Sequence, residues 1–184
     1  MKKTFKLWLA LALLTLTGSQ AWAEDTFTRS FTISFYGNGS SQDESTAITA
    51  NDEISSFADC NSSEVELASF EASRAFKAQQ NWGLKLGTAS APGSVTFTLS
   101  KKVKITQIRY TARQFNANER VVIVNDSTKN NKDAQPLESN FNSYTVTIDE
   151  KQQAETDKIT IATPDSAHRA YIQNVTVTYE SSEL

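Results

Sequence analysis

Hydrophobic and polar residues alternate along much of the chain. The pattern is clearest over residues 27–35, 94–100 and 144–148, where apolar residues alternate with serine and threonine. Residues 158–162 repeat it over a shorter length, and Arg29 is an exception on the apolar side of the first segment. Successive side chains of a β-strand point to opposite faces, so a period of two predicts strands with one buried and one solvated face.

One strand changes phase in its middle. Val103 and Ile105 share one face, whereas Ile108 and Tyr110 fall on the other. A slip of one residue turns every later side chain to the opposite face. We therefore predict a β-bulge near residues 106–107, where one extra residue absorbs the slip.

The last strand of the chain is interrupted as well. Gln173 breaks its apolar side, and Ile172 falls opposite the four residues that align: Tyr171, Val175, Val177 and Tyr179. Residues 121–124 are apolar throughout, which predicts a central strand covered on both faces. Residues 64–70 and 82–87 are further candidate strands. The one helical candidate is 51–58, with Asn51 as its N-cap, and it could equally be a turn.

About eight short, threonine-rich strands and little helix predict an all-β fold. Turn residues such as glycine and asparagine separate the strands. Alternation on one face suits two sheets packed together, so we expect an antiparallel β-sandwich or jelly roll. A single sheet closed on itself is the alternative.

The first 23 residues read as an export signal. Three lysines precede an apolar run of about ten residues from Leu7 to Leu16, half of what a bilayer requires. The small-x-small pattern Ala21-Trp22-Ala23 then predicts cleavage before Glu24. The layout is typical of bacteria. We expect residues 24–184 to form a single domain in the periplasm or outside the cell.

Composition excludes several classes of protein. Cys60 is the only cysteine and His168 the only histidine, which rules out a disulfide framework and multi-cysteine or histidine-rich metal sites. Without the leader, 15 basic residues face 21 acidic ones, a net charge of −6. Such a chain lacks the basic stripe that phosphate backbones require, so we do not expect a nucleic-acid partner.

Six segments carry strand and turn signatures in a characteristic order. They are W-G-L-K-L-G-T (82–88), G-S-V-T-F-T-L (93–99), residues 103–112, 121–125 and 144–148, and R-A-Y-I-Q-N-V-T-V (169–177). This order, over about residues 76–179, resembles β-sandwich modules of secreted bacterial proteins. Those modules are similar to galactose-binding-like jelly rolls. The resemblance implies a sandwich fold and glycan binding, and it transfers no catalytic residue.

Catalytic motifs are weak. A serine nucleophile needs a neighbouring base, and only His168 could serve; the acidic neighbours of Cys60 would not favour a thiolate. A small glycosidase or lyase would need two carboxylates facing across a cleft, whereas the acids here fall mostly in loops. We therefore expect no enzymatic activity.

A structural calcium ion is conceivable, because the jelly rolls that the chain resembles often carry one. Calcium takes six to eight oxygen ligands. Asn51-Asp52-Glu53 and Asn125-Asp126 could contribute, although no D-x-D-x-D-G loop is present. We expect no other cofactor.

Aromatic residues outside the alternating strands are the candidates for a binding site, because sugar rings stack on aromatic rings while their hydroxyl groups need planar polar partners. Each could instead plug the end of the sandwich. The candidate ligand-binding residues are the aromatic Trp82, Tyr36 and Phe115 and the polar Arg113, Asn116 and Asn118.

These observations favour an exported, non-catalytic binding module whose ligand is an extracellular carbohydrate. The alternative is a structural or adhesion protein that contacts an extracellular protein through a sheet face or an edge strand.

Overall fold

The computed structural model describes residues 26–39, 45–116, 123–124, 136–165 and 168–181. Within these residues eleven strands form one hydrogen-bonded network in which every strand pair is antiparallel. In chain order the strands are β1 (Phe27–Phe35), β2 (Thr46–Ala47), β3 (Ala58–Cys60), β4 (Leu67–Ser73), β5 (Ala75–Lys77), β6 (Leu84–Leu86), β7 (Ser94–Gln114), β8 (Ile123–Val124), β9 (Asn142–Thr147), β10 (Glu155–Ala162) and β11 (Ala170–Ser181).

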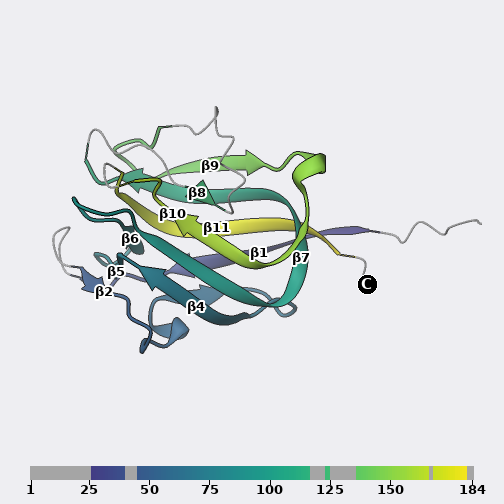
Figure 1. Cartoon of the computed structure of the whole chain (residues 1–184), viewed down its shortest axis with the longest axis horizontal. Coiled ribbons are helices and arrows are strands. Elements are labelled where there is room, and N and C mark those ends of the chain that lie inside the picture. The colour runs from purple at the N-terminus through teal and green to yellow at the C-terminus, as the bar shows by residue number, and fades with distance from the viewer. Residues whose placement is uncertain (1–25, 40–44, 117–122, 125–135, 166–167, 182–184) are drawn as a thin grey trace, which may run out of the picture.

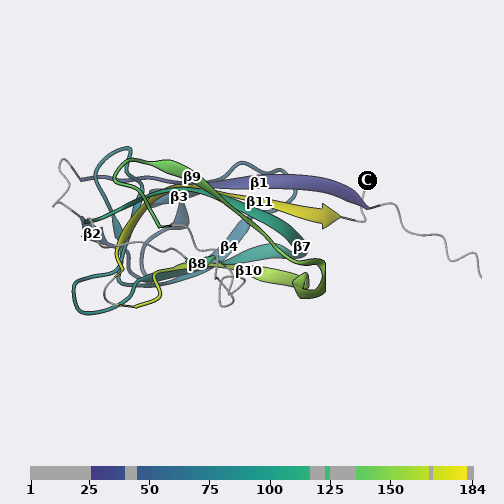
Figure 2. The same cartoon turned by 90° about the horizontal axis from the view of Figure 1, so that it is seen from above.

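The network folds into two layers, seen edge-on in Figure 2. In the first layer β7 lies between β9 and β11. The far side of β11 is shared by β1, which continues to β3, and by β6, which continues to β5 and β2. The second layer runs β4, β7, β10 and β8. The predicted antiparallel sandwich is confirmed.

Strand β7 belongs to both layers. Residues 94–99 pair with β4 and β10, Val103 and Lys104 also pair with β10, and residues 104–114 pair with β11 and β9. Its ribbon curves strongly where it passes between the layers (Figure 1). The sequence pattern treats this segment as two strands, but the structure makes it one strand of 21 residues. The predicted bulge is confirmed at Thr106, since Gln107 pairs with Thr178 while Ile105 pairs with Tyr179.

A second bulge lies in β11. Ile172 pairs with Ala112 and Asn174 pairs with Thr111, which leaves Gln173 as the extra residue. Ile172 therefore joins Val175 and the following apolar residues in the core, and Tyr171 points to the opposite side of the sheet. The expectation that Tyr171 shares a face with Val175 is wrong, because the bulge reverses the alternation between them.

The core lies between the two layers. Phe35 of the first layer stacks against Phe97 of the second, with ring centroids 6.1 Å apart. Buried apolar residues come from both layers: Phe31, Ile33, Ile108, Ala112, Ile172, Val175 and Val177 from the first, and Val95, Leu99, Ile159 and Ile161 from the second.

Arg29 lies on the apolar side of β1, where ionic contacts stabilise it. It forms an ion pair with Glu64, and the hydroxyl of Tyr179, its neighbour across the strands, donates to the same carboxylate at 3.3 Å. Lys101 approaches Glu64 to 3.8 Å.

Two other segments differ from the sequence pattern. The helical candidate 51–58 contains one short 3₁₀ turn, Ile54–Ser56, and no side chain caps its start. Of residues 121–124 the structure describes β8, which pairs with β10 alone among the described strands. It therefore lies at an edge of this part of the sheet and not at its centre.

The burial of Ile172 that results from the bulge at Gln173 can be tested by substitution. We expect Ile172→Ala to lower the free energy of unfolding by about 2–5 kcal/mol, because it leaves a cavity in a packed core. Thr178→Ala, on the same strand but on its outer face, should change it by less than about 0.5 kcal/mol. Urea unfolding monitored by fluorescence measures both, and equal effects would contradict the assigned facing of β11.

Candidate functional site

A row of aromatic and basic side chains crosses the outer face of the first layer. The cross-strand register pairs Phe76 with Lys85, Lys85 with Tyr171, and Tyr171 with Arg113. Their strand neighbours, such as Leu84, Ile172 and Ala112, point into the core, so the row points away from it. Adjacent strands lie about 4.8 Å apart, which places the four side chains within reach of one another.

Aromatic rings gather around Tyr171. Trp82 meets it edge-on, with ring centroids 4.8 Å apart, and Phe115 stacks on it at 5.6 Å. Phe141 in turn meets Trp82 at 6.1 Å. Tyr171 has no exposed surface, whereas the three rings around it are partly buried and keep an accessible part. The inner ring is therefore structural, and the outer rings are available for contact.

Three cations lie against these rings. The guanidinium carbon of Arg113 lies 4.3 Å from the ring centroid of Trp82, and that of Arg169 lies 4.3 Å from the centroid of Phe115. The ammonium group of Lys85 lies 4.8 Å from the centroid of Phe115. These are distances at which an aromatic ring attracts a cation. We call this surface the aromatic–basic face; it comprises Phe76, Trp82, Lys85, Arg113, Phe115, Phe141, Arg169 and Tyr171.

A tight turn between β5 and β6 holds Trp82. Asn81 and Gly83 both have positive φ, 70° and 73°, and the amide of Ala78 donates to the carbonyl of Gly83 at 2.9 Å. A Cβ atom on Gly83 would lie 2.4 Å from the carbonyl oxygen of Ile172, so the close approach of β11 requires glycine here. The side chain of Gln173 donates to the carbonyl of Asn81 at 2.7 Å and ties the turn to β11.

The structure brings together three of the six residues that the sequence proposes for binding. Trp82 lies in the turn before β6, Arg113 lies in the last part of β7, and Phe115 directly follows that strand. Asn116 is exposed beside them. With its side-chain amide oriented so that both polar atoms are hydrogen-bonded, its oxygen accepts from Nη2 of Arg169 at 3.1 Å. Asn118 lies outside the described residues.

Tyr36 lies apart from this group. It follows β1 and is 46% exposed. The pKa of Tyr36 is raised, mainly by its partial burial. The neighbouring carboxylate of Asp59, which accepts a hydrogen bond from the tyrosine hydroxyl, raises it further. Among the described residues no ring or cation of the aromatic–basic face contacts it.

Sequence reasoning missed Phe76, Lys85, Phe141 and Tyr171 as members of the site. Tyr171 and Lys85 are far apart in the chain and meet only through the register of β11 and β6. The interruption at Gln173 was the available signal, since a bulge there would have turned Tyr171 outward.

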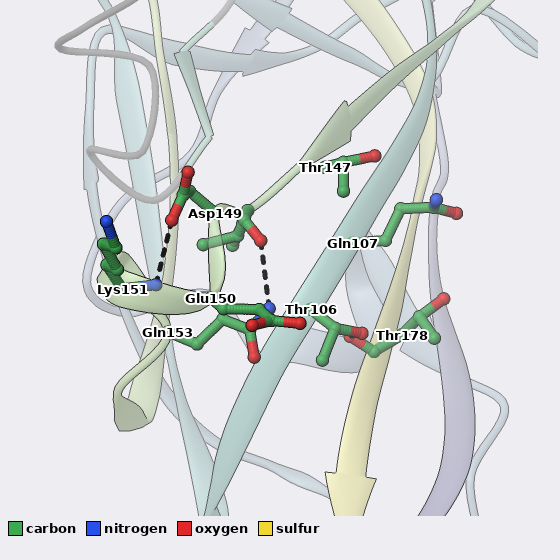
Figure 3. A pocket seen from close by; sticks show the side chains of 9 residues that line it. Thr106, Gln107, Thr147, Asp149, Glu150, Lys151, Gln153 and Thr178 are labelled. Atoms are coloured by element: carbon green, nitrogen blue, oxygen red, sulfur yellow. Dashed lines mark hydrogen bonds between the residues drawn. The ribbon is translucent and has the colours of Figure 1, made fainter.

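Polar side chains continue along the same outer face. Gln107 and Arg113 point the same way from β7, about 20 Å apart at 3.3 Å per residue. Gln107 lines a hollow of about 510 Å³ at the far end, shown in Figure 3. Ile148 lines it together with residues that carry hydroxyl, amide or charged groups: Thr106, Gln107, Thr147, Asp149, Glu150, Lys151, Gln153 and Thr178.

Asp52, one of the residues considered for calcium, has other partners. Asp52 binds Nζ of the buried Lys77 at 2.6 Å and accepts from the amide and hydroxyl of Thr49, both at 2.8 Å. These contacts, led by the one with Lys77, lower the pKa of Asp52 to about 2. In the described part of the chain no three acidic, histidine or cysteine side chains gather to hold a metal ion. Asn125 and Asp126 lie outside that part.

The two residues considered for nucleophilic chemistry have structural partners. The thiol of Cys60 is half-buried and donates to the carbonyl of Val65 at 3.4 Å, and burial raises its pKa. Nδ1 of His168 lies 2.6 Å from the carboxylate of Asp165.

Comparisons with known proteins complement this geometry. No protein-family model and no curated protein matches the chain. Three solved structures are similar over most of the chain. A family 29 carbohydrate-binding module from Piromyces equi is 11% identical, with a TM-score of 0.44, 84% of this chain covered and 91% of that one. A low-affinity xylan-binding module from Roseburia intestinalis is 14% identical, with a TM-score of 0.35 and coverages of 83% and 96%.

The third structure is a family two carbohydrate esterase from Cellvibrio japonicus. It is 10% identical, with a TM-score of 0.37, and the match covers 85% of this chain but 36% of the esterase. At TM-scores below 0.5, none of the three carries an argument about the function of this chain. Among the described residues no helix has the length and apolar character needed to cross a membrane.

The contact between Asp52 and Lys77 predicts a specific pH dependence. The pKa of Asp52 is about 2 in the folded chain, against an ordinary value of 3.8. Its contribution to stability is therefore complete above pH 3.8 and is lost as the pH falls through 2. We expect Asp52→Asn to lower the melting temperature at pH 7 and to lose this effect below pH 2.

Glu53→Gln is the matched control, because it removes a neighbouring carboxylate for which no side-chain cap bond is seen. Thermal unfolding followed by circular dichroism between about pH 1 and pH 7 measures both variants. The same pH-dependent loss in both would show that the effect is general charge and not the Lys77 contact.

Proposed function

We propose that this chain is an exported, non-catalytic module that binds a carbohydrate on the aromatic–basic face. One observation carries the proposal: the partly exposed rings of Trp82 and Phe115 are held at the outer surface by the buried ring of Tyr171. The inner ring fixes the positions of the outer two. The export signal predicted from the sequence of the first 23 residues supports the exported location.

The chemistry of the face suits sugars. The C–H faces of a sugar ring stack on aromatic rings, and its hydroxyl groups need donors and acceptors at defined positions. Arg113 and Asn116 supply such groups beside the rings. Beyond them, the polar side chains along β7 and β11 continue toward the hollow near Gln107, so an extended chain of sugars would meet polar contacts for about 20 Å.

The surface favours this function over an apolar contact with a protein. Among the described residues Tyr36 is the one large hydrophobic residue that is mainly exposed. A single residue does not make the contiguous apolar patch that marks a protein interface. The adhesion alternative therefore has no specific observation in its favour.

Substitution of the outer rings tests the proposal. We expect Trp82→Ala and Phe115→Ala each to weaken binding of a glycan by at least about tenfold, or about 1.4 kcal/mol, because each removes a stacking ring. Tyr36→Ala is the matched control: it removes an exposed ring outside the face and should leave the affinity unchanged. Glycan arrays followed by isothermal titration calorimetry measure the effect, and circular dichroism verifies the fold of each variant.

The same titrations, made with calcium and then with a chelator, test whether a metal ion takes part. Retained binding in both ring variants, or loss of binding in Tyr36→Ala alone, would overturn the proposed site. Absence of binding to any glycan by the folded unmodified chain would overturn the function.

A further inference from the structure

Arg113 differs from three other buried or half-buried cations that the structure describes. Lys77 is paired with Asp52 at 2.6 Å, Lys104 with Glu180 at 2.7 Å, and Arg29 with Glu64. Arg113 has no hydrogen bond or ion pair with any described residue; its contacts are the rings of Trp82 and Phe141. Its Nε is buried and has no acceptor. The positive charge of Arg113 is therefore not neutralised by any carboxylate of the described residues, whereas those of Lys77, Lys104 and Arg29 are.

We propose that the aromatic–basic face binds an acidic saccharide, and that Arg113 receives the carboxylate of a uronic acid. This inference rests on the proposed function and specifies its ligand. A guanidinium group offers a planar fork of donors that matches the two oxygens of a carboxylate. The contact with Trp82, whose ring centroid lies 4.3 Å from the guanidinium carbon, holds the group in place.

The charge around Arg113 is complementary to such a ligand. Lys85 and Arg169 lie on the ring of Phe115 within the same face. The chain is acidic overall, so three cations on one aromatic surface are a local feature and not a reflection of general composition.

An anionic nucleic acid is the less suitable ligand. Single-stranded nucleic acids also stack on aromatic rings, but their binding grooves follow the backbone with continuous positive charge. Here the outward positions of β7 beyond Arg113 are Thr111, Arg109 and Gln107, so one further cation lies on the face, which ends at Asp149 and Glu150. The threonine and glutamine side chains suit sugar hydroxyls, and the two carboxylates would repel a phosphate-bearing segment that reached them.

The test pairs acidic glycans with uncharged counterparts of the same backbone. The full chain is titrated with polygalacturonate, alginate, hyaluronan and glucuronoxylan, each beside its carboxyl-reduced form, and with a single-stranded DNA oligonucleotide. We expect at least one acidic glycan to bind about tenfold or more tightly than its reduced form, and added sodium chloride to narrow the difference.

Variants of Arg113 assign the effect. Arg113→Gln should bring the affinity for the acidic glycan down to that of the reduced form. Arg113→Lys should do so in large part, because it keeps the charge but loses the fork. Lys102→Gln is the matched control, since it removes one exposed charge at the bend of β7, far from the face. It should leave the preference for the acidic form unchanged.

The outcomes separate the two proposals. Equal binding of acidic and reduced glycans, abolished by Trp82→Ala, would overturn the inference and leave the carbohydrate function standing. Binding of the oligonucleotide without any glycan would overturn both. A preference for the acidic form that survives in Arg113→Gln would overturn the role of Arg113.

Discussion

The extra residue at Gln173 determines what each side of β11 presents. Without a bulge, the alternation of the strand would put Tyr171 in the core together with Val175. The bulge instead sends Ile172 inward, where it is fully buried, and leaves Tyr171 on the outer side. The same residue then uses its side chain to hold the turn that carries Trp82, through the hydrogen bond to the carbonyl of Asn81. One backbone irregularity thus supplies both the inner ring of the aromatic–basic face and the anchor of an outer ring.

This arrangement gives the outer face a small packed cluster of its own. Tyr171 has no exposed surface although it lies on the side away from the main core. Its cover consists of rings and of cations lying on rings, and not of aliphatic side chains. Such contacts hold the side chains in defined orientations while their polar ends stay near solvent. Such packing favours a face that is ordered before any ligand arrives, and an ordered face would lose less entropy on binding.

The sequence predicts the part of the fold that depends on local periodicity. The strands β1, β9 and β10 follow from alternation, and the bulge at Thr106 follows from the phase slip around it. The short strands β2, β3 and β5 have two or three residues, too few to show a period. Gln173 was visible as an interruption, but a polar residue in an apolar row has several readings, and only the pairing with β7 shows that it is an extra residue.

The candidate site, too, could be predicted from the sequence only in part. Trp82, Arg113 and Phe115 could be proposed because they are aromatic or planar residues near turns. Lys85 and Tyr171 could not, because they enter the site through contacts between strands that are about 86 positions apart in the chain. Tyr36 resembles the other candidates in sequence, yet its position at the end of β1 directs it to Asp59. Residue type suggests candidates, and register decides which of them meet.

Strand β7 has a further consequence for how the molecule comes apart. It is hydrogen-bonded to four other strands, two in each layer, and Arg113 lies near its end. Neither layer can lose β7 without opening the other, so the sandwich lacks a plane along which it could separate into independently stable halves. We therefore expect unfolding to be cooperative across both layers. A destabilising core substitution in the second layer, for example in β10, would therefore unfold the whole sandwich, including the aromatic–basic face.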